Sequence, residues 1–370
     1  MDFRFTQEQD EAAELAASIL DDRATNERQK AVEAGGDRFD RDLWAALGEA
    51  GLLGLALPER YDGAGLGLVE LCRVLVEVGR TVAPVPLAAH GPATRLIAEH
   101  GSDEQQARWL PRAATGGAVV TAAVAEELSW APEHPTTTAT PDGDGHRLTG
   151  SKAVVPAGPY ADLVLVPAAT PSGVGVFLVE PGDSGVKVVA QRFSDRDAVA
   201  RLDLDGVTLG ADRLLGAADG AADHRLRQLM VLGGAAEQLG ITEGALRLTA
   251  SYAKTREQFG RPIGTFQAVS QRLADGYIDV LGQRLTLWQA AWRLDEGLPA
   301  DTEVAIAKLW AADAGHRLAH TAVHVHGGVG IDLDGETHRY FTGAKRFELL
   351  HGGATEQALR IGRALAALPV

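Results

Sequence analysis

Residues 255–267 read TREQFGRPIGTFQ and join two segments of helical periodicity. Arg256 carries a planar fork of donors that suits a phosphate, and Phe259 carries a flat apolar face. Gly260 and Pro262 interrupt the helical pattern, so we expect this cation and this ring to lie on a turn. The combination is typical of a ligand-binding site. A basic residue at a helix end also serves as a solvated cap, and this stretch alone leaves both interpretations open.

A second glycine-rich stretch, HVHGGVG at residues 324–330, favours the interpretation as a binding site. The net charge of −15 argues against nucleic acid as a partner, because neutralising its phosphates requires clustered Lys and Arg. An anionic ligand therefore needs a local basic pocket. Arg256 and Arg261 are the residues that we expect to provide it.

The length and composition indicate a multidomain globular protein. At 370 residues the chain is expected to form two or three domains of roughly 150 residues each. Hydrophobic residues make up 45% and charged residues 23%, which argues against disorder. We see neither an apolar run of the roughly 20 residues that span a bilayer nor a secretory signal, and we expect a cytoplasmic protein. The single Cys72 excludes an internal disulfide and is expected to be a buried inert thiol.

Hydrophobic periodicity divides the chain into three parts: a helical domain at 1–116, a β-domain at 117–212 and a helical bundle at 213–370. In the first part, Ser102 and Gln105 form the pattern of a capping box before a helix. In the second, short β-rich runs separated by turn residues fit a barrel or sandwich. These runs are 147–149, 161–166, 174–179, 186–189 and 200–204.

The third part has helical patterns that are each longer than 20 residues, at 231–256, 267–298 and 302–325. Patterns of this length separated by short turns fit an antiparallel arrangement of four helices. The expected fold class is therefore an α+β multidomain chain with an N-terminal helical domain, a central β-domain and a C-terminal four-helix-bundle-like domain.

Two motifs in this order, YAKTREQFGRPI at 252–263 and HGGVG at 326–330, resemble the acyl-CoA dehydrogenase family. Residues 57–67 look like the family's N-terminal helical signature, and residues 148–152 look like its central strand, so the resemblance spans nearly the whole chain. It implies FAD as the cofactor. In this family FAD lies between the β-domain and the bundle of one subunit, and the bundle of a neighbouring subunit holds its pyrophosphate and adenine end.

When the family's flavin-binding residues are placed on this sequence by position, the resemblance implies that this chain contributes a set of flavin contacts to a neighbouring subunit. The chemistry agrees, since Arg pairs with a diphosphate, glycine lets backbone N–H groups approach it, and Gln both donates and accepts. His324 stands where the family usually has Gln, and a purely structural histidine is an equally good interpretation. The implied cofactor-binding residues are Arg256, Gln258, Phe259, Phe266, Gln267, His324, Gly327 and Gly328.

The chain departs from the family on the β-domain side of the flavin site. The family's flavin-binding loop there is replaced by residues 126–132, which read EELSWAP. Val154 and Pro156 stand where the family has a Trp and a hydroxyl residue. Val154 lacks the flat ring that would pack against the isoalloxazine, and Pro156 has no backbone N–H to donate. We therefore expect the chain's own flavin cleft to be poor.

Both positions at which the family places its catalytic Glu lack a carboxylate. The usual position, 21 residues beyond Gly330, is His351, and the alternative position is Met230. Dehydrogenation requires a base that removes the α-proton of the thioester. His351 as a base and a relocated Glu348 or Glu356 are two possibilities, but we favour the absence of any base, so no catalytic residue is assigned to this chain.

The segments 264–280, 338–341 and 352–355 are similar to β-subunits of bacterial steroid side-chain acyl-CoA dehydrogenases, which are α2β2 heterotetramers. This similarity implies a homologous, Glu-bearing partner subunit that binds most of the acyl-CoA, an electron-transfer-flavoprotein-type acceptor, and inactivity of this chain alone. A self-sufficient homotetramer that uses His351, a flavin-dependent monooxygenase and a non-enzymatic structural partner are the alternatives.

Overall fold

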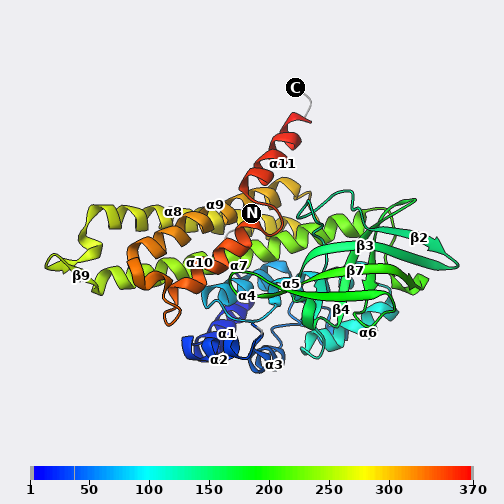
Figure 1. Ribbon diagram of the computed structural model, residues 1–370, viewed down its shortest axis with the longest axis horizontal. Helices are drawn as coiled ribbons and strands as arrows, with labels where there is room; N and C mark the ends of the chain where they lie inside the picture. Colours follow the sequence, from blue (N-terminus) through cyan, green and yellow to red (C-terminus); the bar gives the residue numbers. More distant parts are fainter. Residues whose placement is uncertain (1–3, 37, 368–370) are drawn as a thin grey trace. The chain divides into compact units, whose positions relative to one another are not determined.

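The computed structural model describes residues 4–36 and 38–367. The chain forms two compact units that are interleaved along the sequence. The helical unit combines the described residues of Met1–Ala31, Cys72–Ala83 and Gly234–Val370, and the mixed unit combines Val32–Leu71 and Pro84–Gly233. The predicted order of helices, strands and again helices is confirmed (Figure 1). None of the helices in the described ranges has the length and apolar character that crossing a membrane requires.

Two of the helices described in the mixed unit begin at side-chain caps. Asp40 accepts a hydrogen bond from the backbone N–H of Leu43 at 3.1 Å, and Ser102 forms the predicted capping box with Gln105. These helices are α3 (Arg41–Glu49), α5 (Leu87–His100) and α6 (Asp103–Ala114), with the start of α4 (Leu68–Arg80). Short 3-10 turns are η1 (Glu59–Tyr61), η2 (Gly158–Tyr160) and η3 (Ala211–Arg213).

The strands of the mixed unit pair in the order β6-β7-β3-β2-β4-β5-β8, and β1 pairs with β4. The pairings of β4 with β1 and β2 are parallel and the others are antiparallel. The expected barrel or sandwich thus takes the form of one open, mixed sheet, whose core includes Leu148, Phe177 and Val207. The strands are β1 (Val120–Ala122), β2 (Thr138–Asp142), β3 (Gly145–Pro156), β4 (Leu163–Thr170), β5 (Gly173–Val179), β6 (Val186–Arg192), β7 (Ala198–Leu209) and β8 (Leu214–Leu215).

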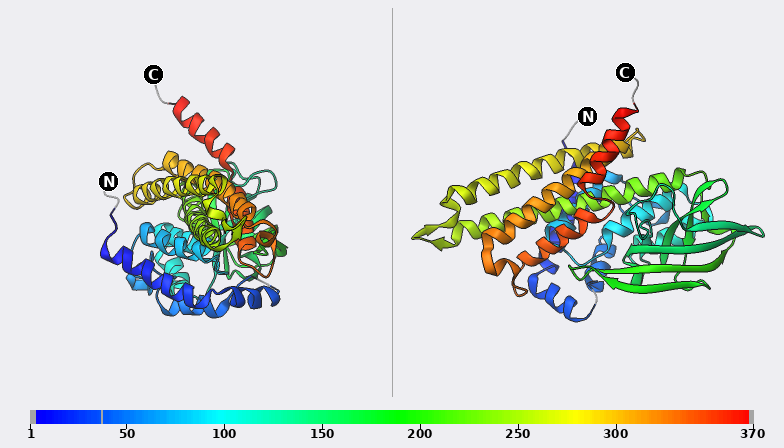
Figure 2. Two further views of the ribbon diagram at one scale, coloured as in Figure 1. Left: turned by 90° about the vertical axis from the view of Figure 1, so that its left-hand side faces the viewer. Right: turned by 45° about the horizontal axis from the view of Figure 1, so that its top comes forward.

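Long helices build the helical unit, in which α9 packs against α8, α10 and α11 (Figure 2). Their length follows from the sustained 3.6-residue period of the sequence. α7 starts in the mixed unit, ten residues before the predicted Val231. The helices are α1 (Gln7–Arg23), α2 (Asn26–Ala34), α7 (Ala221–Thr255), α8 (Gln267–Asp295), α9 (Asp301–His326), α10 (Thr337–Leu349) and α11 (Ala354–Ala366).

Candidate functional site

The stretch between α7 and α8 forms a β-hairpin, which we call the clamp hairpin (residues 256–267). Its strands β9 (Glu257–Gln258) and β10 (Arg261–Pro262) are antiparallel, and η4 (Ile263–Thr265) leads into α8. The two residues of the turn, Phe259 and Gly260, have φ angles of 53° and 74°. Turns with two positive φ angles favour Asn-Gly, and a bulky residue in this region is strained. The turn therefore holds Phe259 at an energetic cost.

Most side chains of the clamp hairpin face solvent, and Phe266 is half-buried. Phe259 is 92% exposed, and its ring meets that of Phe266 edge-on with centroids 6.1 Å apart. The guanidinium of Arg261 lies 4.3 Å from the Phe266 centroid. Arg256 and Gln258 are exposed, and no carboxylate of the described residues pairs with Arg256. A strained, exposed ring beside an uncompensated cation is the kind of feature that function, rather than folding, maintains.

The glycine-rich turn lies at the end of α9, where η5 (Gly327–Ile331) begins. Gly327 has a φ of 65°, and a Cβ atom built on Gly327 or Gly328 meets nothing within 4 Å. The backbone of both residues is therefore open to a ligand, and a side chain at Gly327 would be strained.

An aromatic stack connects this turn to the clamp hairpin. The rings of Tyr252, near the end of α7, and His326, at the end of α9, stack with centroids 4.3 Å apart. His326 is further held by a 2.8 Å hydrogen bond between its Nδ1 and the carbonyl of Ala322. The two motifs of the sequence thus form one surface, and His324, exposed in the last turn of α9, remains available to a ligand. Gln267 is exposed as the first residue of α8.

This surface fits a ligand that carries a diphosphate and a flat ring. Arg256 supplies a fixed charge with parallel donors, and the open glycine backbone lets N–H groups approach the same anion. Phe259 and Phe266 offer apolar faces. No described carboxylate lies within ion-pair distance of Arg256 to compete for it.

At the usual base position, His351 is buried and only 5% exposed. Burial, together with the charge of Lys308, lowers the pKa of His351 to about 3. A general base works best when its pKa lies near the operating pH, so an imidazole with this pKa is a weak acceptor for a carbon-bound proton. The alternative position, Met230, is a buried side chain of α7 without acid–base chemistry.

The two glutamates near His351 are engaged in ion pairs. Glu348 lies 3.0 Å from the Nδ1 atom of His316 and 2.5 Å from the Nζ atom of Lys345. Burial opposes ionisation of Glu348, but the hydrogen bonds from Lys345 and His316 outweigh it and lower its pKa. Glu356 pairs with Arg360 at 3.1 Å. Carboxylates engaged in ion pairs of this kind are poor candidates for a relocated base.

Sequence reasoning missed Lys308, a fully buried residue of α9. Its Nζ atom donates to the carbonyl oxygens of Phe347 at 2.7 Å and Glu348 at 3.2 Å, at the end of α10. Burial lowers the pKa of Lys308 to about 7. A signal was present, because Lys308 is the only charged residue between Val304 and Ala312.

A second missed residue is Glu126, in the segment that replaces the family's flavin loop. Its buried carboxylate accepts five hydrogen bonds. Burial opposes its charge, but Lys152 and the threonines outweigh burial and lower the pKa of Glu126 to about 2. The donors are the backbone N–H and hydroxyl groups of Thr136 and Thr137 and the Nζ atom of Lys152, which lies at 2.8 Å.

Val154 and Pro156, the two residues of β3 that differ from the family's pattern, are half-buried. The carbonyl of Pro156 accepts a 2.6 Å hydrogen bond from the hydroxyl of Thr121, so this end of β3 is tied to β1. Val154 presents an aliphatic side chain where a flat ring was expected from the resemblance. The polar groups of Glu126 and Pro156 thus satisfy neighbouring protein groups.

Comparison with known proteins gives the family. Residues 6–117 match the N-terminal domain of acyl-CoA dehydrogenases, and residues 230–366 match their C-terminal domain. The chain is 47% identical to the acyl-CoA dehydrogenase FadE27 of Mycobacterium tuberculosis, with 100% of both chains covered. The chain therefore belongs to the acyl-CoA dehydrogenase family.

Two solved structures are similar over almost the whole chain. The ChsE4-ChsE5 complex from Mycobacterium tuberculosis matches with a TM-score of 0.95 and 47% identity over 100% of both chains. A variant of the steroid acyl-CoA dehydrogenase Tcur3481-Tcur3483 matches with a TM-score of 0.92 and 44% identity, over 97% of this chain and 98% of that one. Within the family, the chain thus resembles one protein described as a complex of two components and another described as a steroid acyl-CoA dehydrogenase.

Proposed function

We propose that this chain is one subunit of an FAD-dependent acyl-CoA dehydrogenase and supplies flavin contacts to a partner subunit that carries the catalytic Glu. The similarity to ChsE4-ChsE5 and to Tcur3481-Tcur3483 supports a two-component enzyme that acts on the CoA ester of a steroid side chain. The reaction is α,β-dehydrogenation in the β-oxidation of that side chain, and the proposed location is the cytoplasm.

The observation that carries the proposal is an uneven distribution of functional groups. The clamp hairpin and the glycine turn are exposed and fit a diphosphate, whereas the base position holds His351 with a pKa of about 3. FAD, when bound, supplies the acceptor for the hydride of the β-carbon. In this assignment, Arg256 neutralises the diphosphate, Gly327 and Gly328 present backbone N–H groups to it, and Phe259 covers an apolar face.

The chain's own β-domain supports the same assignment. The carboxylate of Glu126 is satisfied by protein donors, and Pro156 has no N–H to offer a flavin. We infer that productive flavin sites form only where the clamp hairpin of this chain meets the β-domain of the partner. An α2β2 tetramer would then hold two flavins, and its reduced form would pass electrons to an electron-transfer-flavoprotein-type acceptor.

Co-expression with a Glu-bearing homologue tests the stoichiometry. We expect a heterotetramer with two flavins that reduces an acceptor dye in the presence of a steroid side-chain CoA ester. Four flavins or none per tetramer would contradict the proposal. A yellow, active enzyme from this chain alone would instead favour the homotetramer, and oxygen uptake with free reduced flavin would favour a monooxygenase.

Replacement of Arg256 by Ala tests the clamp itself. The flavin content of the purified complex should fall sharply, because the diphosphate loses its charged partner. Arg363→Ala is the matched control, since Arg363 is an exposed arginine of α11 outside the clamp hairpin. Equal flavin content in both variants would leave the chain as a structural partner only.

A further inference from the structure

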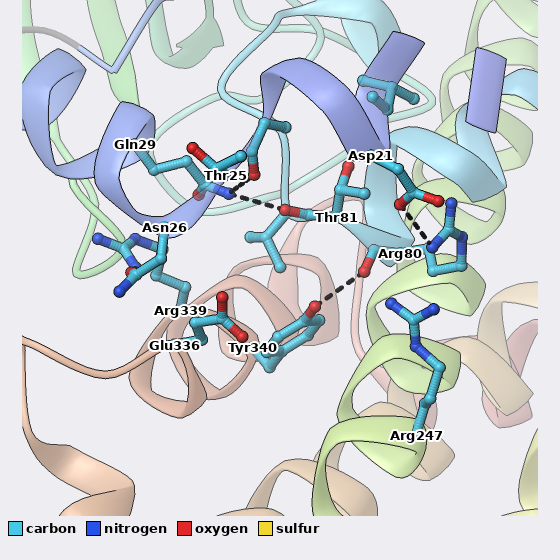
Figure 3. Close-up of a pocket in the computed structure, with 13 residues that line it drawn as sticks. Asp21, Thr25, Asn26, Gln29, Arg80, Thr81, Arg247, Glu336, Arg339 and Tyr340 are labelled. Carbon is cyan, nitrogen blue, oxygen red and sulfur yellow. Dashed lines mark hydrogen bonds and ion pairs between the residues drawn. The ribbon is translucent and has the colours of Figure 1, made fainter. Parts of the chain in front are cut away.

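A polar pocket of about 250 Å³ lies in the helical unit, apart from every residue assigned above to flavin or to the base position. Its walls come from α1, the turn into α2, the end of α4, α7 and the start of α10 (Figure 3). These segments are far apart in the sequence, so the pocket is a product of the tertiary fold. We propose that it binds a small oxyanion, a carboxylate or a phosphate.

Three arginines line the pocket, each from a different segment, and they differ in how their charge is used. Arg80 is compensated, because it pairs with Asp21 at 3.0 Å and with Glu77 at 2.5 Å. Arg339 is 4% exposed, and its Nη1 atom donates to the Oδ1 atom of Asn26 at 2.6 Å. Both guanidinium groups are therefore fixed in place by neighbours.

Arg247 is the lining arginine whose charge is not paired within the described residues. Its side chain extends from α7 into the pocket toward the Arg80 end (Figure 3). Within the described ranges it has neither a hydrogen bond nor an ion pair. A guanidinium brought close to a second one, without an anion of its own, offers a binding point for a carboxylate or a phosphate, which it holds through two parallel N–H donors.

The charge balance of the pocket agrees with an anionic ligand. Its lining holds the three arginines and two carboxylates, Asp21 and Glu336, and Asp21 is already paired with Arg80. Glu77, outside the lining, also pairs with Arg80, so the positive charge available to a ligand is that of Arg247 and Arg339 against Glu336, in a chain whose net charge is −15. Because Glu336 also faces the pocket, the best ligand has a hydrogen-bond donor next to its anionic group.

The walls are built to keep this geometry without a ligand. The hydroxyl of Tyr340 donates to the carbonyl of Arg80 at 2.9 Å, and burial raises the pKa of Tyr340 to about 12, so it stays a donor. Gly244 of α7 leaves room for this contact, since a Cβ atom there would lie 2.4 Å from the Tyr340 ring and 2.5 Å from the Arg80 carbonyl. A preformed site loses less entropy when a ligand binds.

The base of α2 is fixed in the same way. The Nε2 atom of the buried Gln29 donates to the carbonyls of Ala24 and Thr81, both at 2.9 Å. This side chain ties the turn between α1 and α2 to the end of α4. Arg247 is therefore an unpaired cation on a wall whose other parts are already fixed.

Isothermal titration calorimetry of the full-length chain tests the proposal, with inorganic phosphate and malonate as separate probes at constant ionic strength. We expect one saturable site for at least one probe and a matching rise in unfolding temperature. Phosphate binding alone would identify a phosphate ligand, malonate binding alone a carboxylate ligand, and binding of both a general oxyanion site.

Three variants locate the site. Arg247→Gln should weaken binding about tenfold or more, because a charged hydrogen-bonding partner is lost. Arg363→Gln, an exposed arginine outside the pocket, should leave it unchanged. Arg256→Gln separates this site from the flavin proposal, because loss of binding in Arg256→Gln, with binding retained in Arg247→Gln, would place the anion at the clamp hairpin and overturn the inference. Absence of binding by both probes, or equal binding by wild type and Arg247→Gln, would overturn the inference.

Discussion

The Nζ atom of Lys308 lies 2.7 Å from the carbonyl oxygen of Phe347, inside the core of the helical unit. This lysine binds the last carbonyl groups of α10, where the negative end of the helix dipole favours a cation. Burial works against the same charge and brings the pKa of Lys308 to about 7. Near neutral pH this residue therefore exists in both protonation states.

We expect Lys308 to make the stability of the protein rise with pH above neutrality. In the unfolded chain a lysine titrates near pH 10.4, whereas the folded pKa is about 7. Between these values the unfolded state binds the additional proton, so the free energy of unfolding increases as pH rises from about 7 to about 10. Denaturant unfolding across this range should show the free energy of unfolding rising with pH. Lys308→Met should remove the part of this rise that is due to Lys308. Parallel curves for both proteins would contradict the assignment.

A second pH dependence should appear on the acid side and arise from His351. The folded pKa of about 3 lies below the unfolded value of roughly 6.5, so the folded state resists protonation. As pH falls from 6.5 to 4, the stability should decrease by up to roughly 3 kcal/mol on account of this group. His351→Asn suits the positive φ of 65° and should lose this part of the acid sensitivity, as measured by urea unfolding at pH 7 and pH 4.

We expect replacement of only one member of the Glu126–Lys152 ion pair to destabilise the protein. Glu126→Gln removes the carboxylate that contacts the buried Lys152 ammonium at 2.8 Å, leaves only the more distant charge of Asp223, and should lower the free energy of unfolding by about 3 kcal/mol. The double variant Glu126→Gln/Lys152→Met removes both charges and should recover most of this loss. Glu127→Gln, on the exposed neighbouring residue, should change the stability by less than about 0.5 kcal/mol. A double variant as unstable as the single one would show that the pairing is unimportant.

At the tip of the clamp hairpin, stability and binding should change in opposite directions. Phe259→Asn places Asn-Gly in the turn, the pair that two positive φ angles favour, and should stabilise the chain by up to about 1 kcal/mol. The same change removes the exposed ring and should lower the flavin content of the complex. Phe259→Leu, which keeps an apolar side chain and the strain, should give no gain in thermal stability. Thermal unfolding and flavin absorbance measure the two effects.

Much of the fold could be predicted from hydrophobic periodicity, because a long run with one period is compatible with only one type of secondary structure. The run 174–179 lies in β5, the run 161–166 overlaps β4 from Leu163 onward, and the pattern from 267 onward corresponds to α8. The period did not predict β9 and β10, whose strands are two residues long. Their geometry depends on a turn that places Phe259 where its own preferences oppose it.

For the site, sequence reasoning identified the exposed residues better than the buried polar ones. Arg256 and Phe259 stand out because a turn carries them. Glu126 was treated only as part of a substituted loop, since its five donors come from residues ten or more positions away and from Lys152 on β3. The role of Lys308 depends on contacts with α10, 39 residues further along the chain. Such partners are fixed by tertiary structure, which spacing does not reveal.

The stack of Tyr252 on His326 has a consequence for recombining relatives of this protein. Segments 252–267 and 324–330 lie far apart in the gene but share one aromatic contact, so they behave as a single module. A chimera that exchanges only one of them would join a tyrosine and a histidine optimised for different neighbours. Crossover points for directed recombination are therefore better placed before Tyr252 and after Gly330, so that both segments come from the same parent together with α8 and α9.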